Sequence, residues 1–529
     1  MKKYSSFISI ILVLAVIAFA SSGCSDSSQA VNQDAKVEKN LVIAIADEIQ
    51  GTDVQQVNWS NIVHKLLYAP LLAYDLDLKN LNSDFLEGYE ISQDGMQLTF
   101  KLPKDAKFSN GDPLTAEEMK KSMERYKQVS PYAGDLDPIK EFIVKDTQTL
   151  ILKLDSPAAY MMPVLASDFS GPVDTRKSEE ISKEDFNRKA VSNGLFKVDE
   201  WTQGSQIVLL RNDNYVTHAP FVENKGPSKV DKVTIRFINE NFTRVSELES
   251  GNVDILVDVP AESVNELKAN QDIQMYEYMQ AGINYIRMNT NQKLLDDINV
   301  RTAIALSINR DELKKGLRDL IIPRYGFVSP AQICYDANTE NALQEKLKLN
   351  IDKAKSLLAQ SGWVDQNGDG IVEKDGKPLK ITMMVALDRP SIKQAAPILQ
   401  AQLKQVGINL ELREYESKYI RQMVKEGKFE LASGNNEWTD PDILYYGFAK
   451  KLDLPWSSPE VDKLLTDARY MMDMTKRTAT YGEAQNKIIE ELPAIPLYSE
   501  VYYIAAKKSV TGIKISTSGQ IYLNDVDKE

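Results

Sequence analysis

The sequence predicts a mixed α/β protein built from more than one lobe. At 529 residues, the chain is well beyond the size that one hydrophobic core supports, so two or three domains are expected. Residues 379–415 read as strand, helix and strand in succession, which is typical of a βαβ unit. We expect the chain to cross between the lobes near residues 280–290 and again near residues 495–505.

Short strands and helices alternate through the first half of the chain. Residues 41–47 form an apolar run typical of a strand, and residues 61–75 have the apolar spacing of a helix that Pro70 ends or bends. Thr115 and Glu118 form a capping box at the start of the next helix. Further strands are expected at residues 98–102, 147–154, 192–212 (two strands around 202–204) and 232–238, followed by a helix at 241–251.

The second half carries longer helices. We expect helices at residues 297–317, 350–362, 392–407 and 476–492, and strands at 379–387, 408–415, 427–433 and 493–506. The loop that follows strand 427–433 reads GNNEWTDPD and brings three acids beside a tryptophan. Acids beside an aromatic residue can hold a metal, act as an acid/base pair or bind an ammonium group, and they can also be a solvated turn. The residues alone leave these alternatives open.

Composition and motifs exclude several classes of function. The net charge is −13 and the sequence has no long basic stripe, so no nucleic-acid partner is expected. The Walker A, G-x-S-x-G, H-E-x-x-H and C-x-x-C motifs are missing from the sequence. A dyad of Cys334 with His64 or His218 is the enzymatic alternative, but a lone cysteine is more often a packing residue. We therefore expect neither enzyme activity nor a cofactor.

The N-terminus reads as an export signal with a lipid attachment site. Lys2 and Lys3 precede an apolar run and then small residues, which is typical of a secretory signal peptide over residues 1–23. The segment SSGC resembles a bacterial lipobox in which Cys24 carries the lipid, and the alternative is cleavage after Ala20. Residues 24–40 lack a hydrophobic pattern and are expected to form a flexible tether. We expect an exported protein, anchored by lipid to the cell membrane at its extracellular face or in the periplasm.

The segment DQNGDGIVEKDG, residues 365–376, has two interpretations. Asp365, Asn367, Asp369 and Gly370 match the first positions of a calcium loop, but the position that needs a glutamate is Gly376. The alternative is a β-hairpin whose aspartates and glycines serve the turns. The hairpin is the preferred interpretation, and no metal site is predicted.

The order of motifs resembles one family, the family 5 extracellular solute-binding proteins of ABC importers, of the oligopeptide- and dipeptide-binding type. The resemblance extends over about residues 41–515. The segments that carry it, in the family's order, are DGMQLTFKLPKDAKFSNGDPLTAEE, SNGLFKVDEW, VLLRNDNYV, LESGNVDI, NVRTAIALSINRDEL, AKSLLAQSGW, QLKQVGINLEL and LPAIPLY. Leu195 and Val216 depart from the proline and the tryptophan that are usual in these segments.

The resemblance implies a two-lobed α/β fold of the periplasmic-binding-protein type (type II), with two crossing strands as a hinge and the ligand enclosed between the lobes. It also implies the large class of this fold, in which an extra domain is inserted in lobe I. The implied division is lobe I at residues 41–75, 196–285 and 503–529, the inserted domain at 76–195 and lobe II at 286–502.

The resemblance also assigns a role to the acidic loop. In peptide-binding members, an acid four residues before a proline pairs with the ammonium group of the peptide. That acid is Glu437, four residues before Pro441, where the family usually has aspartate. Asn435 and Asn436 would offer backbone groups to an extended peptide, and Trp438 would form a pocket wall. The weaker contact candidates are Val57, Asn58, Trp59 and Tyr132.

The implied function is the capture of short peptides by a lipid-anchored monomer, which delivers them to a membrane permease and its ATPases. The alternative cargoes are a nickel chelate, haem or an oligosaccharide. A nickel chelate is the less expected of these, because nickel favours histidine and the sequence has only two histidines. A surface sensing protein is the alternative outside transport.

Overall fold

The computed structural model describes residues 38–449 and 454–529. The predicted signal peptide, Cys24 and most of the predicted tether lie outside these residues. Within the described part, no helix combines the length and the apolar composition that a bilayer span requires.

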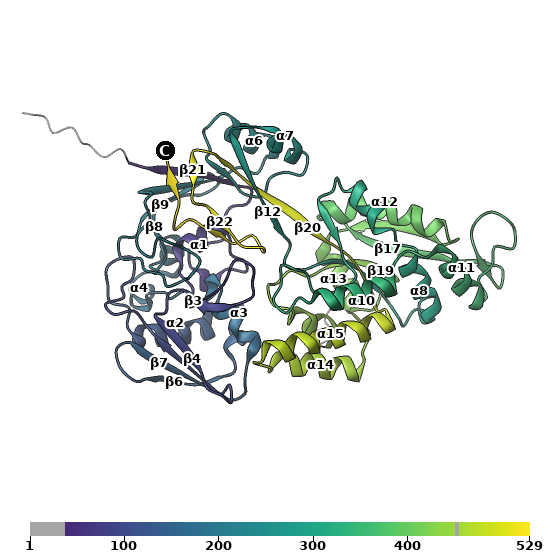
Figure 1. The fold of residues 1–529 in the computed structure, drawn as a ribbon, viewed down its shortest axis with the longest axis horizontal. Helices are drawn as coiled ribbons and strands as arrows, with labels where there is room; N and C mark the ends of the chain where they lie inside the picture. The colour runs from purple at the N-terminus through teal and green to yellow at the C-terminus, as the bar shows by residue number, and fades with distance from the viewer. Residues whose placement is uncertain (1–37, 450–453) are drawn as a thin grey trace, which may run out of the picture. The chain divides into compact units, whose positions relative to one another are not determined.

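A large mixed sheet extends through the fold (Figure 1). Its strands follow in the order β18 (Asn409–Tyr415), β17 (Lys380–Ala386), β19 (Leu431–Asn435), β13 (Asn284–Met288), β20 (Ala494–Lys507), β11 (Ile255–Leu256), β1 (Asn40–Ile45), β10 (Lys232–Phe237), β9 (Gln206–Arg211) and β8 (Phe196–Thr202). Strands β12 (Ile273–Met279) and β14 (Ile321–Pro323) also pair with β20.

Strand β20 joins the two halves of this sheet. Its first residues, 494–498, pair with β13, and its last residues, 501–507, pair with β12. Because β12 and β13 follow each other along the chain, two antiparallel segments run side by side from one half to the other (Figure 1). Both predicted crossings fall in these segments and are confirmed.

Each half of the sheet has its own hydrophobic core. One cluster of buried side chains is drawn from residues 41–255 and 504–526, and another from residues 283–498. The first cluster includes a small sheet in the order β4 (Gly88–Ile91), β5 (Gln97–Lys101), β7 (Thr149–Leu154) and β6 (Ile139–Val144), together with helix α2 (Ala116–Val129). The predicted inserted domain therefore shares a continuous core with its flanking segments, and the domain boundaries stay a prediction.

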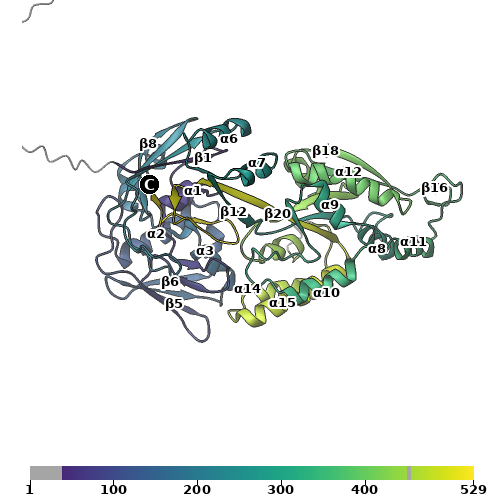
Figure 2. The same ribbon diagram turned by 45° about the horizontal axis from the view of Figure 1, so that its top comes forward.

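Helices cover both faces of the second half of the sheet. Figure 2 shows α12 on one side and α14 and α15 on the other, as Figure 1 also does. These helices are α8 (Ile298–Leu306), α9 (Arg310–Gly316), α10 (Ala337–Leu347), α11 (Ile351–Gln360), α12 (Pro390–Lys404), α13 (Ser417–Lys425), α14 (Pro459–Arg469) and α15 (Met474–Glu491). Further short helices lie before residue 270: α3 (Met162–Leu165), α4 (Thr175–Glu180), α5 (Lys183–Arg188), α6 (Asn241–Glu249) and α7 (Val264–Ala269).

Four two-residue strands near the C-terminus form two small pairs, β21 (Val510–Thr511) with β24 (Asp527–Lys528) and β22 (Lys514–Ile515) with β23 (Ile521–Tyr522).

Two predicted helices differ in the structure. The predicted helix at 297–317 is two helices, α8 and α9, because the side chain of Asn309 accepts a hydrogen bond from the N–H of Glu312 (3.1 Å) and starts a new helix. Helix α1 (Ile62–Leu67) ends before Pro70, and the residues after that proline form strand β2 (Leu72–Tyr74), which pairs with β3 (Leu81–Ser83). The residue before a proline is disfavoured in helical conformation, so the helix stops there.

The segment at residues 365–376 forms turns and a hairpin. Strand β15 (Glu373–Lys374) pairs with β16 (Lys377–Pro378) across Asp375 and Gly376, which both have positive φ. The Asp365 carboxylate accepts hydrogen bonds from the N–H groups of Gly368 (2.8 Å) and Gly370 (3.0 Å). The predicted hairpin is therefore present, and a calcium site stays the alternative, because carboxylate oxygens of Asp365, Asp369 and Glu373 lie within 4.8 Å of one another.

Candidate ligand-binding site

The candidate site lies at the carboxyl ends of three parallel strands. Strand β17 pairs in parallel with both β18 and β19, so the loops after these strands meet at one edge of the sheet. Ligands of open α/β sheets bind at this edge. The loop after β17 leads into α12, the loop after β18 leads into α13, and the loop after β19 carries Glu437.

The loop that carries Glu437 is fastened to the crossing between β12 and β13. The N–H of Asn436 donates to the carbonyl of Ile283 (3.0 Å), and Asn436 Oδ1 accepts from the N–H of Ile283 (2.8 Å). The N–H of Trp438 donates to the carbonyl of Ala281 (2.8 Å). Gly282 lies between them, where a Cβ would be 2.0 Å from the Asn436 carbonyl oxygen. The loop and the crossing therefore approach so closely that only glycine fits.

Two buried ion pairs support the loop from behind. Asp440 and Arg477 are both 0% exposed and form a bidentate pair, with Nη1–Oδ2 at 2.7 Å and Nη2–Oδ1 at 2.8 Å. Asp442 lies 3.1 Å from Nε of Arg469. Burial raises the pKa of Asp442 to about 7, and the nearby Asp440 adds to this rise. Two of the three acids in the loop are therefore structural.

Glu437 is the acid of this loop that solvent reaches. Its partial enclosure by protein atoms raises the pKa of the carboxyl group, and the negative charges of Glu500 and Asp258 raise it further. The rings of Tyr278 and Tyr502, with centroids 5.4 Å apart, lie within the electrostatic reach of Glu437. Carboxylates beside aromatic rings form a favourable environment for a cation.

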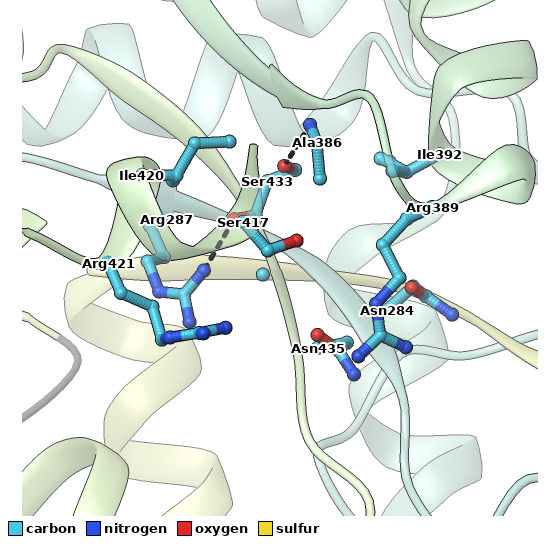
Figure 3. Close-up of a pocket in the computed structure, with 11 residues that line it drawn as sticks. Asn284, Arg287, Ala386, Arg389, Ile392, Ser417, Ile420, Arg421, Ser433 and Asn435 are labelled. Carbon is cyan, nitrogen blue, oxygen red and sulfur yellow. Dashed lines mark hydrogen bonds between the residues drawn. The ribbon is translucent and has the colours of Figure 1, made fainter. Parts of the chain in front are cut away.

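An arginine pocket lies beside this loop (Figure 3). Its volume is about 90 Å³, enough for several water molecules or a small chemical group. The eleven residues that line it are Asn284, Arg287, Ala386, Arg389, Ile392, Ser417, Ile420, Arg421, Ser433, Gly434 and Asn435. Among these described residues are three arginines and no carboxylate. The charge of Arg389 opposes the rise in the pKa of Glu437, so the cationic and anionic parts of the site are neighbours.

Four of the predicted site residues are brought together here. Asn435 lines the arginine pocket, and Asn436, Glu437 and Trp438 follow it directly. The N–H of Asn436 does not have the role expected of it, because its hydrogen bond to Ile283 leaves no donor for an extended peptide. Trp438 is half-buried, and its role as a pocket wall stays a prediction.

The other four predicted residues lie on two segments that a hydrogen bond joins. The hydroxyl of Tyr132 donates to the carbonyl of Asn58, and Tyr132 and Trp59 keep 40% and 37% of their surface exposed. Val57 is 1% exposed, and its side chain packs in the core. Within the described residues, no hydrogen bond or ion pair connects this group to the Glu437 loop. Their contact with a ligand stays a prediction.

Sequence reasoning missed the three arginines. A signal for two of them was present, since Arg389 follows the predicted strand 379–387 and Arg421 follows the predicted strand 408–415. Strands of a βαβ unit are parallel, so residues after their carboxyl ends gather at one edge. Arg287 lies within β13, and its place beside the other two depends on how β13 joins the sheet.

The chain matches known families and proteins over most of its length. The family described as "Bacterial extracellular solute-binding proteins, family 5 Middle" matches residues 80–453. The oligopeptide-binding protein AppA of Bacillus subtilis is 26% identical, over 97% of this chain and 96% of that protein. The probable D,D-dipeptide-binding periplasmic protein DdpA of Escherichia coli is also 26% identical, over 84% of this chain and 85% of that protein.

Solved structures share the fold. NikA from Brucella suis, in complex with Fe(III)-EDTA, superposes with a TM-score of 0.80 at 21% identity, over 93% of this chain and 100% of that one. AppA from Bacillus subtilis, in complex with a nonapeptide, superposes with a TM-score of 0.71 at 23% identity, over 93% and 99%. The predicted two-lobed α/β fold, with two crossing strands, is confirmed.

Proposed function

This chain belongs to the bacterial extracellular solute-binding proteins of family 5, and from that premise we propose that it captures short peptides for an ABC importer. It delivers them to a membrane permease that is driven by ATPases. The observation that carries the proposal is the position of the solvent-accessible Glu437 carboxylate beside the arginine pocket.

The charges of the site match the two ends of a peptide. A free peptide carries an ammonium group at one end and a carboxylate at the other, whatever its side chains. Glu437, with Glu500 and Asp258 nearby, stabilises the ammonium group, and Arg389 stabilises the carboxylate. Two fixed charges therefore set the position of the backbone, while side chains of different sizes are tolerated.

The spacing suits a short peptide. Asn435, the last residue of β19, lines the arginine pocket and stands two residues before Glu437. Two residues of chain span at most about 7 Å. An extended dipeptide spans about the same length, since each residue covers at most about 3.6 Å. The proposed cargo is therefore a peptide of two or three residues.

The contact with the ammonium group is tested by changing both partners. Glu437→Gln keeps the shape of the side chain and removes its charge. Because Glu437 is solvent-accessible, the expected loss of affinity for Ala-Ala is at least tenfold, about 1.4 kcal/mol, rather than the 3–5 kcal/mol of a fully buried pair. N-acetyl-Ala-Ala is expected to bind wild type at least tenfold more weakly than Ala-Ala. Its affinity for the Glu437→Gln variant is expected to be only slightly lower than its affinity for wild type.

Titration calorimetry on the four combinations measures the coupling between Glu437 and the ammonium group. Equal affinity of wild type for Ala-Ala and its acetylated form would show that Glu437 does not hold the terminus. Absence of binding for all short peptides would reject the peptide cargo itself.

A metal chelate with carboxylate groups is the second candidate cargo. The arginine pocket suits any carboxylate, and the similar structure from Brucella suis holds Fe(III)-EDTA. Histidine ligation is not supported, because neither histidine of the sequence lines the arginine pocket. The ring of His64 hydrogen bonds to Gly51 and Asn61, and the backbone N–H of His218 donates to the carbonyl of Asp84 (2.6 Å). Calorimetry with Ni(II)–histidine and Fe(III)–EDTA compares these cargoes with peptides.

A lipid anchor on Cys24 and an extracellular or periplasmic location complete the proposal. The segment SSGC after the apolar run supports it, and a monomer on a tether suits repeated encounters with a permease. Cys24→Ser is expected to release the protein from the membrane fraction into the medium or periplasm. A wild-type protein already found soluble, with Ser21 as its first residue, would contradict the anchor.

A further inference from the structure

The arginine pocket holds more positive charge than one carboxylate needs. Arg389 lies before α12, Arg421 lies on α13 and Arg287 lies on β13. Figure 3 shows the guanidinium groups of Arg287 and Arg421 on one side and that of Arg389 on the other, all directed toward the space between them. A guanidinium group binds a carboxylate through two parallel hydrogen bonds, so the α-carboxylate of a peptide is fully satisfied by Arg389 alone.

The three guanidinium groups differ in how far the protein itself uses them. Arg287 is buried, donates to the carbonyl of Ser433 and stacks over the ring of Tyr285 at 5.0 Å, so it is part of the wall. Arg421 is exposed, and among the described residues its guanidinium makes no ion pair with a carboxylate. A long cationic side chain directed into a pocket, without an acidic partner there, is suited to bind an anion from outside.

Besides Glu437, two acids, Asp388 and Glu500, hydrogen bond to residues that line the pocket. The Asp388 carboxylate accepts from the N–H (3.0 Å) and the hydroxyl (2.7 Å) of Ser417. The Glu500 carboxylate accepts from Asn284 Nδ2 (3.0 Å) and from the hydroxyl of Ser391 (2.7 Å). Both lie at the edge of the pocket and offset part of its charge, but neither belongs to its lining.

The apolar part of the lining indicates the shape of the group that carries the anion. Ile392, Ile420 and Ala386 are buried and line the same cavity as the arginines. An aliphatic stem that ends in a carboxylate packs its methylene groups on these side chains and places its charge at Arg421. Glutamate and aspartate side chains have this form, and the volume of about 90 Å³ admits a group of that size.

We infer that the preferred cargo carries two carboxylates at its carboxy-terminal end, as a short peptide that ends in glutamate or aspartate does. Arg389 binds the α-carboxylate and Arg421 binds the side-chain carboxylate. This inference rests on the proposed peptide-binding function, and it adds a substrate class to it.

The test compares two peptides that differ only in the charge of the last side chain. Ala-Glu and Ala-Gln are titrated calorimetrically against wild type, Arg421→Gln and Arg413→Gln. Arg413 is the matched control, because it lies on β18 of the same lobe with an exposed side chain outside the pocket, and its change removes the same charge. Wild type and Arg413→Gln are expected to bind Ala-Glu at least tenfold more tightly than Ala-Gln. For Arg421→Gln, the affinity for Ala-Glu is expected to exceed that for Ala-Gln by less than threefold.

Each other outcome contradicts a different part of the reasoning. If wild type binds both peptides with equal affinity, the two-carboxylate preference is wrong while the peptide-binding function stands. If Arg421→Gln keeps the preference for Ala-Glu, the assignment to Arg421 is wrong. If neither peptide binds wild type, both the proposed function and this inference fail.

Discussion

Removing the buried charge of Asp440 is expected to destabilise the second lobe strongly. Asp440 and Arg477 are both 0% exposed and share two hydrogen bonds of 2.7 and 2.8 Å. Asp440→Asn keeps the size of the side chain but leaves the Arg477 guanidinium buried beside a neutral amide. It also turns one hydrogen-bond acceptor into an NH₂ group that faces another donor.

The magnitude follows from the burial of the pair. Removing one partner of a buried ion pair costs about 3–5 kcal/mol. The lower end is expected here, because the Asp442 carboxylate is close enough to stabilise the charge of Arg477 in part. For a folding unit of roughly 200 residues, about 3 kcal/mol lowers the melting temperature by roughly 6–12 °C.

Differential scanning calorimetry measures this shift. The matched control is Asp467→Asn, which removes an exposed ion pair with Lys463 on α14, where the two side chains are 44% and 74% exposed. Because exposed pairs contribute at most about 1 kcal/mol, its melting temperature is expected to fall by less than about 4 °C. Equal shifts for the two variants would refute the claim that burial of the pair supports the binding loop.

Two further predictions concern the loop itself. Peptide affinity is expected to fall as the pH drops through the raised pKa of Glu437, because only the ionised carboxylate attracts the ammonium group. The fall in affinity should begin above pH 4.5, the ordinary pKa of a glutamate. Calorimetric titrations between pH 8 and pH 4 measure it, and the Glu437→Gln variant should not show it. Gly282→Ala is expected to lower both the melting temperature and the peptide affinity, since its Cβ would lie 2.0 Å from the Asn436 carbonyl oxygen. Gly88→Ala is the control, because nothing lies within 4 Å of the added carbon; similar melting curves for the two glycine variants would contradict the close approach.

Local structure was largely predictable from the sequence. The side chain of Thr115 accepts from the N–H of Glu118 (3.4 Å) at the start of α2, which is one half of the predicted capping box, while Oε1 of Glu118 accepts from Lys121 (3.2 Å). The apolar run at residues 493–506 corresponds to β20, and the strand, helix and strand at 379–415 correspond to β17, α12 and β18. These features depend on residues that are close in sequence, so a short window contains the information.

The errors arise where a local pattern is ambiguous. The apolar residues on both sides of Pro70 fit one helical stripe, but the proline separates a helix from a strand. The stripe at residues 297–317 continues through Asn309, although that side chain caps a new helix. In both places the pattern of apolar residues is correct, and the position of one backbone-directing residue decides the structure.

The sequence by itself determined the family resemblance, the order of the elements and the position of Glu437 in a loop after a strand. Only the tertiary structure decided what surrounds that carboxylate. Arg287 precedes Arg389 and Arg421 by more than a hundred residues along the chain, yet the three arginines line one pocket because β13, β17, β18 and β19 lie in one sheet. Likewise, Asp440 and Asp442 could not be distinguished from Glu437 by composition. Their burial against Arg477 and Arg469 depends on helices α14 and α15, and electrostatic roles of this kind arise from contacts between distant segments.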